Sequence, residues 1–165
     1  MSMKPKSTLP ERAAKHFRDG YNCSQSVLLM MFEHWGGNNE LVPKIATAFG
    51  AGIGRCGSVC GAVTGGVMAV GTRYGTNEPS AKKRAKAYDL GRRLYEQFAK
   101  RNGSVLCREL VGYDLTDPTE RGKASESKVF EKRCPVFVKS MVEILLELPE
   151  DRPSQFPTRL RSVLK

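Results

Sequence analysis

The feature that most constrains the fold of this chain is a glycine-rich stretch from Phe49 to Gly71. It contains half of the 16 glycines and two of the five cysteines, Cys56 and Cys60. Glycine destabilises a helix or strand by roughly 0.5–1 kcal/mol relative to alanine. Such a density therefore indicates that another group approaches the backbone closely. A second helix, a phosphate and a metal centre are the three candidates.

Length, charge and cysteine content narrow the class of protein. A chain of 165 residues is long enough to bury a hydrophobic core, which favours a single domain that spans residues 1–165. Its longest uncharged stretch, 17 residues from Cys56 to Thr72, is too short for a membrane span. No apolar leader follows Met1, and the number of cysteines is odd, which together favour the cytoplasm. The net charge of +10 favours solubility or an acidic partner.

Hydrophobic spacing predicts a mainly α chain, a bundle of about six to eight helices with no significant sheet. Thr8 with Glu11, Asn22, Ser58 and Ser80 are the N-cap signals. Residues 113–128 are polar and turn-rich and predict a long loop, and residues 150–165 form a basic tail. The expected helices are 8–18, 22–35, 41–49, 59–73, 81–101, 104–112, and a last helix that Cys134-Pro135 opens and that runs to about 148.

The same spacing predicts which side chains are buried. The expected core positions are Val27, Leu28, Met31, Phe32 and Trp35; Ala85, Tyr88, Leu94, Tyr95 and Phe98; and Val136, Phe137, Met141, Ile144, Leu145 and Leu148. Within 59–73, we expect Gly57, Gly61 and Gly65 to form a smooth face at four-residue intervals, with Cys56 and Cys60 on the same side.

Cysteines recur at predicted helix starts. Cys23, Cys60, Cys107 and Cys134 each fall at the cap or in the first turn of an expected helix. A helix N-terminus has unpaired N–H donors and about half a positive charge, and both lower the pKa of a thiol. If the four starts converge, they form a thiolate pocket suited to an iron–sulfur cluster or to tetrahedral zinc. Free cysteines are also common in protein cores, so a thiol pocket that binds no cofactor is a further alternative.

Three other patterns in the sequence could indicate a functional site. Cys56 and Cys60, four residues apart, could form a redox dithiol or supply two ligands to one metal. Residues 52–57 match the dinucleotide-binding fingerprint, but that fingerprint needs a preceding strand, and 43–49 are predicted to be helical. His16 and His34 are too scattered for a histidine metal site.

The ordered cysteine pattern resembles the C_GCAxxG_C_C family, redox-active proteins of bacteria and archaea. The resemblance rests on Gly20-Tyr-Asn-Cys-Ser-Gln-Ser-Val27, Cys60-Gly-Ala-Val-Thr-Gly65, Cys107-Arg-Glu-Leu110 and Cys134, and covers about residues 10–147. It implies a helical redox protein whose four family cysteines are Cys23, Cys60, Cys107 and Cys134, with an iron–sulfur cluster as one cofactor they could hold. Cys56 is an addition to this pattern.

Three functions follow, and none identifies a substrate. The first is an electron-transfer protein whose Cys23, Cys60, Cys107 and Cys134 hold an iron–sulfur cluster, with Gly61 and Gly65 leaving room for it and a redox partner protein unknown. The second is a thiol–disulfide redox protein or sensor with Cys56 and Cys60 as the reactive pair. The third is a non-enzymatic binding module for an acidic partner. Nucleic acid is not expected, because no aromatic platform is interleaved with the basic segments. A homo-oligomer is compatible with all three.

Overall fold

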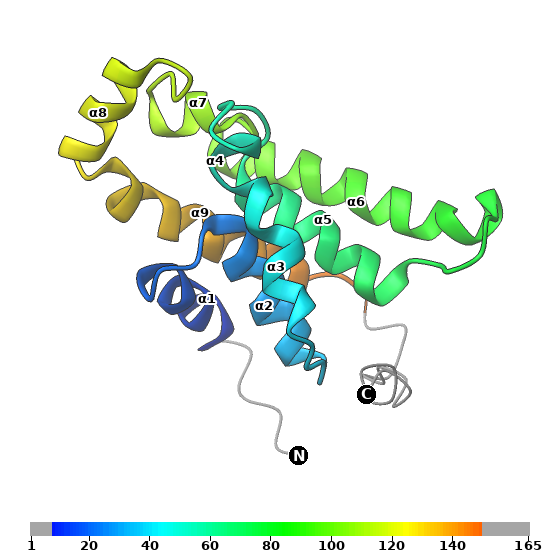
Figure 1. Ribbon diagram of the computed structural model, residues 1–165. Coiled ribbons are helices and arrows are strands. Elements are labelled where there is room, and N and C mark those ends of the chain that lie inside the picture. The colour runs from blue at the N-terminus through cyan, green and yellow to red at the C-terminus, as the bar shows by residue number, and fades with distance from the viewer. Residues whose placement is uncertain (1–7, 150–165) are drawn as a thin grey trace.

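The computed structural model describes residues 8–149, which form a bundle of helices packed around α2 (Figure 1). A mainly α chain without significant sheet is confirmed for these residues, where the one β-type pairing is an isolated bridge between Val59 and Leu106. The predicted tail, 150–165, lies outside the described residues. In chain order the segments are α1 (Leu9–Arg18), α2 (Cys23–His34), α3 (Leu41–Ala46), the 3-10 turn η2 (Thr47–Phe49), α4 (Gly50–Ile53), α5 (Gly61–Tyr74), α6 (Ala81–Asn102), α7 (Cys107–Val111), α8 (Pro118–Glu126) and α9 (Val129–Leu146).

Segment α4 is not a right-handed helix, because Ala51 and Gly52 have positive φ angles of 53° and 67°. That leaves eight helices in the described residues, within the predicted range. No helix of residues 8–149 combines the length and the apolar character that crossing a membrane requires.

Helix α2 lies at the centre of the core. It packs against α1, α3, α5 and α9, so most of its surface must be apolar. The predicted core positions on this helix are confirmed, and Met30 is buried as well. Its buried apolar residues, with Trp35 just after its end, are Cys23, Val27, Leu28, Met30, Met31, Phe32 and Trp35.

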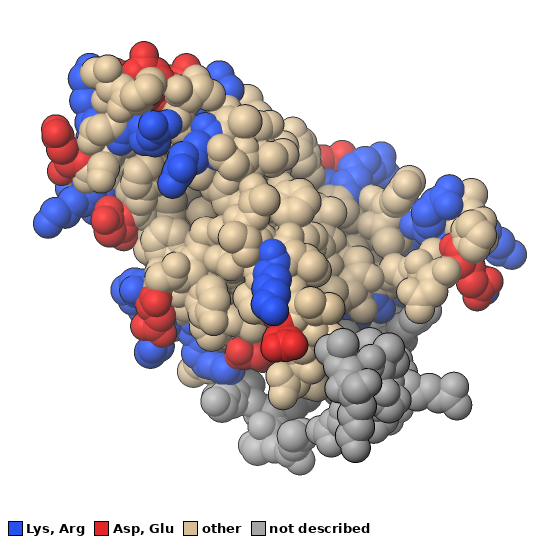
Figure 2. Space-filling view, in the orientation of Figure 1, with Lys and Arg blue, Asp and Glu red and all other residues tan. Residues whose placement is uncertain are grey.

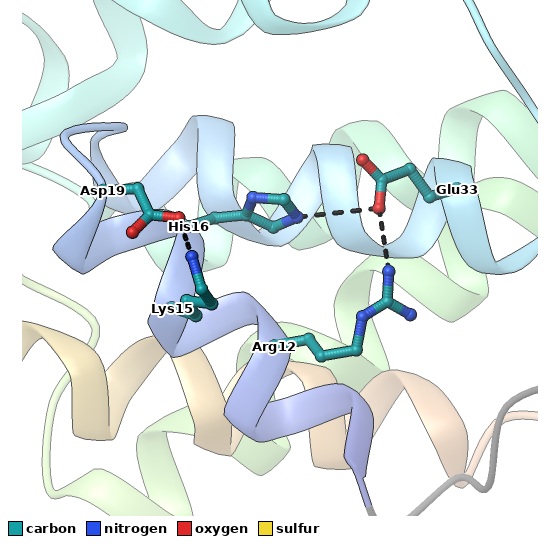
Figure 3. A network of polar contacts seen from close by, with 5 residues as sticks. All are labelled: Arg12, Lys15, His16, Asp19 and Glu33. Atoms are coloured by element: carbon teal, nitrogen blue, oxygen red, sulfur yellow. Dashed lines mark hydrogen bonds and ion pairs between the residues drawn. The ribbon is translucent and has the colours of Figure 1, made fainter.

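Polar contacts fasten α1 to the outer side of α2 (Figure 3). Arg12 donates a hydrogen bond of 3.2 Å to Glu33, and Nε2 of His16 lies 3.6 Å from the same carboxylate. Lys15 of α1 pairs at 2.5 Å with Asp19, the residue that follows the helix. Exposed pairs of this kind contribute about 0–1 kcal/mol each. They orient α1 more than they stabilise the fold.

Two of the four predicted N-caps are confirmed. The side chain of Asn22 accepts from Gln25 N–H in a full capping box, and Ser80 accepts from Lys83 N–H. Thr8 is at the N-cap of α1 as predicted, but the predicted capping bond was wrong, because its side chain makes no cap hydrogen bond. The prediction at Ser58 was wrong too: α5 begins two residues later than expected, with Cys60 at the N-cap.

The predicted loop over 113–128 was wrong in its second half, which forms α8. Asp117 caps this helix by accepting from the N–H groups of Thr119 and Glu120, and Pro118 is its first residue. Ala124 is its one buried residue, so α8 carries almost no hydrophobic periodicity. The capping pair Asp117-Pro118 was the available signal.

Helix α9 begins at Val129, five residues before Cys134, so the prediction that Cys134-Pro135 opens it was wrong. Pro135 lies inside the helix and removes one backbone hydrogen bond. Val129 is buried and Phe130 packs against the core, which gives the extra turns an apolar anchor. Val136 was also wrongly placed in the core, since 54% of its surface is exposed.

Helix α6 presents a different face from the one predicted. Leu94 and Phe98 are buried as expected, and Leu90 is buried as well. Ala85, Tyr88 and Tyr95 were predicted to be buried but are exposed. Figure 1 shows α6 running alongside α5 at one side of the bundle. Only one narrow stripe of α6 therefore meets the core.

Candidate functional site

Four buried cysteines arrive from four different helices. Cys23 is the first residue of α2, Cys60 is the N-cap of α5, and Cys107 is the first residue of α7, as their spacing predicted. Cys134 is the exception, because it lies within α9 rather than at its start. Between 4% and 7% of each residue is exposed, and all five cysteines are free. We call these four residues the cysteine pocket.

The start of α2 is tied to the segment that covers it. Asn22 and Gln25, which form the capping box beside Cys23, also reach α3 and η2. Asn22 Nδ2 donates to the carbonyl of Thr47 at 2.8 Å, and Gln25 Nε2 donates to the carbonyl of Pro43 at 2.9 Å. The position of Cys23 is therefore fixed relative to α3 by the residues that start its own helix.

A short backbone pairing brings Cys60 and Cys107 together. The N–H of Cys60 donates to the carbonyl of Val105 at 2.8 Å, and the N–H of Cys107 donates to the carbonyl of Ser58 at 2.7 Å. These bonds flank the isolated bridge between Val59 and Leu106. Two helices that start far apart in the sequence thus begin side by side.

A left-handed turn covers the pocket. Positive φ angles run through Ala51, Gly52, Ile53, Gly54 and Arg55 without interruption. We call residues 50–57 the covering loop. Its backbone bonds to itself, as in the 3.0 Å bonds from Gly54 N–H to the Gly50 carbonyl and from Ser58 N–H to the Gly52 carbonyl.

The covering loop touches two of the four cysteines. The backbone N–H of Ala51 helps to lower the pKa of the Cys23 thiol. A Cβ atom on Gly52 would lie 2.8 Å from the Cβ of Cys107 and 2.5 Å from the N atom of Ser58. The sequence did not predict a role for Ala51, because Ala51 contributes a backbone group and not its side chain. The alternating glycines of Gly50-Ala-Gly-Ile-Gly54 were the signal that a left-handed turn was present.

The other glycines place α5 against α2. A Cβ on Gly61 would lie 3.2 Å from the Cβ of Cys23, and one on Gly65 would lie 2.5 Å from the Ser24 carbonyl oxygen. Gly57 does not share this face, contrary to the prediction, because it precedes α5 and lies 3.1 Å, by the same measure, from the Cβ of Arg108. Gly61 and Gly65 together let the starts of the two helices meet.

Hydrogen bonding and burial divide the four thiols into one with a lowered pKa and three with a raised pKa. The Cys134 thiol donates to the Cys23 sulfur, and this bond, helped by the N–H groups of Cys23 and Ala51, lowers the pKa of Cys23. The same bond and burial raise the pKa of Cys134. Burial first, and the neighbouring Cys23 second, raise the pKa of Cys60 and raise that of Cys107 to about 12. The pocket therefore favours a thiolate at Cys23 and opposes a second negative charge.

Cys56 lies outside the cysteine pocket. Its side chain is exposed on the covering loop, whereas Cys60 is buried. The Arg108 side chain binds backbone carbonyls of the covering loop and not a cysteine sulfur. It donates to the Cys56 carbonyl at 2.8 Å and to the Gly57 carbonyl at 3.2 Å. The pairing of Cys56 with Cys60 stays a prediction.

The side chains of residues 8–149 include no group of three or more His, Cys, Asp or Glu residues arranged to hold a metal ion. The pocket nevertheless offers four sulfur donors and several N–H groups directed at them. Iron–sulfur clusters are held by cysteine sulfurs, and these sulfurs accept hydrogen bonds from the surrounding protein. The donor set fits such a cluster in number and kind.

Comparison with known proteins agrees with the cysteine pattern. Residues 21–148 match the family described as "Putative redox-active protein (C_GCAxxG_C_C)", and this range contains all four cysteines of the pocket. Neither a curated protein nor a solved structure matches the chain. Since the match covers well over half of the sequence, the chain belongs to the C_GCAxxG_C_C family.

Proposed function

We propose that this protein transfers electrons through an iron–sulfur cluster held by Cys23, Cys60, Cys107 and Cys134. The observation that carries the proposal is the convergence of four buried thiols from four helices in one electrostatically linked group. The family description supports redox activity in general and does not name a cofactor. When bound, the cluster supplies one-electron oxidation and reduction.

Electrostatics support a cationic occupant. Mutual repulsion and burial raise the pKa values of Cys60, Cys107 and Cys134, so these three thiols resist ionisation on their own. Metal cations compensate such repulsion and deprotonate coordinating thiols outright. The N–H groups of Ala62 and Val63, at the start of α5, bind the Cys60 sulfur and would stabilise it as a thiolate ligand.

A cluster and a zinc ion need different arrangements of the four sulfurs. Zinc, with zinc–sulfur distances of about 2.3 Å, needs its four sulfurs gathered around one point. The described side chains have no such grouping. A cluster distributes its cysteine ligands over more than one iron atom, so it accepts sulfurs that are further apart.

Iron and acid-labile sulfide analysis of anaerobically purified protein, with a visible spectrum, tests the proposal. We expect both elements and a sulfur-to-iron charge-transfer band in the native chain. Serine variants at the four pocket cysteines should each lose most of the iron. Cys56→Ser is the matched control and should retain it, because Cys56 is exposed on the covering loop. Absence of iron and sulfide after anaerobic reconstitution would refute the proposal.

The hydrogen bond between Cys134 and Cys23 favours a second candidate, a thiol–disulfide redox protein. In this reaction Cys23 and Cys134 form one S–S bond, release two protons and pass two electrons to an oxidised acceptor such as another disulfide. A lowered thiol pKa beside a second thiol is typical of such dithiols. Peptide mapping without reduction after mild oxidation distinguishes the alternatives: a Cys23–Cys134 bridge supports this candidate, a Cys56–Cys60 bridge supports the sequence-based pair, and five free thiols exclude both.

A further inference from the structure

An exposed apolar surface covers one side of the bundle, over α3, η2 and α4. The exposed fractions are 49% for Leu41, 54% for Ile45, 37% for Phe49 and 44% for Ile53. The first three recur every four residues and therefore share the outer face of α3 and η2. Residues 41–53 thus supply four of the nine large hydrophobic side chains exposed in the described part of the chain. We call these four residues the apolar face.

The charges beside the apolar face are mainly positive. Lys44 and Arg55 are exposed beside the apolar face, and Glu40, which immediately precedes Leu41, is exposed at its edge. Figure 2 shows that the centre of this side of the molecule is largely uncharged, with most charges towards its edges. A patch with an apolar centre and a charged, mainly positive border has the composition of a protein interface.

Only one layer of backbone separates the apolar face from the cysteine pocket. The N–H of Ala51 helps to lower the pKa of Cys23, Gly52 packs against Cys107, and Ile53, the next residue, is exposed. Electron tunnelling falls steeply with distance, so electrons enter and leave a buried centre where its cover is thinnest. The left-handed backbone of Ala51 and Ile53, unusual outside glycine, keeps this layer thin and turns Ile53 outward.

We infer that the apolar face is the docking surface for an acidic electron-transfer protein. The inference rests on the proposed electron-transfer function and adds the partner's chemistry and its place on the surface. The partner would set apolar side chains against Leu41, Ile45, Phe49 and Ile53, and carboxylates against Lys44 and Arg55. Complementary charge of this kind orients the encounter and raises the association rate.

A second copy of this chain fits the surface less well. A two-fold dimer places the same patch on both sides of the interface. In residues 40–56 a single carboxylate, Glu40, is available to pair with two cations, Lys44 and Arg55, so a two-fold interface leaves positive charges without a partner carboxylate from this segment. Like charges across an interface are destabilising.

Two variants with matched exposure and charge test the inference. Ile45→Glu lies on the apolar face, and Val136→Glu lies on α9; 54% of each native side chain is exposed. An acidic flavodoxin serves as the probe. Binding to the reduced, cluster-free chain is followed by NMR chemical-shift changes, and electron transfer from the reduced probe to the reconstituted protein is followed by stopped flow.

We expect the flavodoxin to shift resonances of residues 41–56. Ile45→Glu should weaken binding and slow electron transfer by at least about tenfold, whereas Val136→Glu should change both by less than about twofold. Equal effects of the two variants, or shifts confined to α6 or α9, would overturn the inference. So would a dimer, measured by ultracentrifugation, that Ile45→Glu converts to a monomer. Iron analysis reports on the proposed function separately, so binding without iron refutes the cluster and leaves the docking surface intact.

Discussion

The two halves of the glycine-rich stretch use glycine for different physical reasons. In the covering loop, Gly52, Gly54 and Gly57 have φ angles of 67°, 57° and 64°, in the left-handed region that L side chains rarely adopt. In α5, Gly65 has ordinary helical geometry, but its missing side chain leaves space for the backbone of α2. One half shapes the chain locally, and the other sets the distance between two helices.

The difference teaches that both kinds of glycine serve the same four sulfurs. The covering loop brings an N–H group to Cys23 and packs on Cys107, while the packed glycines of α5 bring Cys60 up to Cys23. Replacement by alanine separates the two roles. A packing glycine should affect global stability, and a loop glycine should affect the pocket first.

The largest effect is expected from Gly65→Ala. The added methyl group would lie 2.5 Å from the carbonyl oxygen of Ser24, which belongs to the backbone of α2 and cannot move alone. We expect a loss of about 3 kcal/mol in the free energy of unfolding, at the upper end for overpacked cores. Urea denaturation of the reduced chain, followed by circular dichroism, measures it.

The neighbouring residue provides the control. A methyl group on Gly66 would meet the side chain of Met141 at 2.6 Å, and methionine adapts readily. Gly66→Ala should therefore cost about 1 kcal/mol or less. Similar losses in the two variants would show that the close approach of α2 and α5 is not what Gly65 provides.

Gly52→Ala should have the second largest effect, concentrated at the pocket. Alanine at a φ of 67° costs about 1–2 kcal/mol, and its methyl group would also overlap Ser58 and Cys107. We expect about 2 kcal/mol of destabilisation, together with faster reaction of Cys107 and Cys23 with a thiol reagent. In the native chain only the exposed Cys56 should react rapidly. Unchanged labelling of the buried thiols would show that the loop does not cover them.

Local rules in the sequence were sufficient for most of the fold. Asn22 and Ser80 cap their helices because a polar side chain at these positions replaces missing backbone partners, whatever the rest of the chain does. The errors arose where tertiary contacts decide. Tyr88 and Tyr95 follow helical spacing but are exposed, because α6 meets the core along a single stripe through Leu90 and Leu94.

The site was predictable to a similar extent. Cys23, Cys60 and Cys107 lie at helix starts, a local property that caps and turns reveal. Cys134 reaches the pocket from the middle of α9, and the proline after it indicated a helix start that the packing of Val129 overrides. The contribution of Ala51 is a backbone N–H group, which no residue type announces.

Ile53→Asn tests whether the covering loop is strained. Ile53 has a φ of 64°, where a β-branched residue is disfavoured and asparagine is tolerated. Because 44% of its side chain is exposed, little packing is lost on replacement. We expect stabilisation of about 1 kcal/mol, measured by urea denaturation of the reduced chain. Destabilisation would mean that the apolar contacts of Ile53 outweigh its backbone strain.

The smallest effect is expected from Gly71→Ala, in the last turn of α5. This glycine lies inside the helix, and a methyl group added there would meet no atom within 4 Å. Neither role found in the rest of the stretch applies to it, so only the flexibility of glycine in the unfolded chain is lost. We expect stabilisation of roughly 0.5–1 kcal/mol, visible as a higher urea midpoint with an unchanged slope. A destabilised variant would contradict the open surroundings of Gly71.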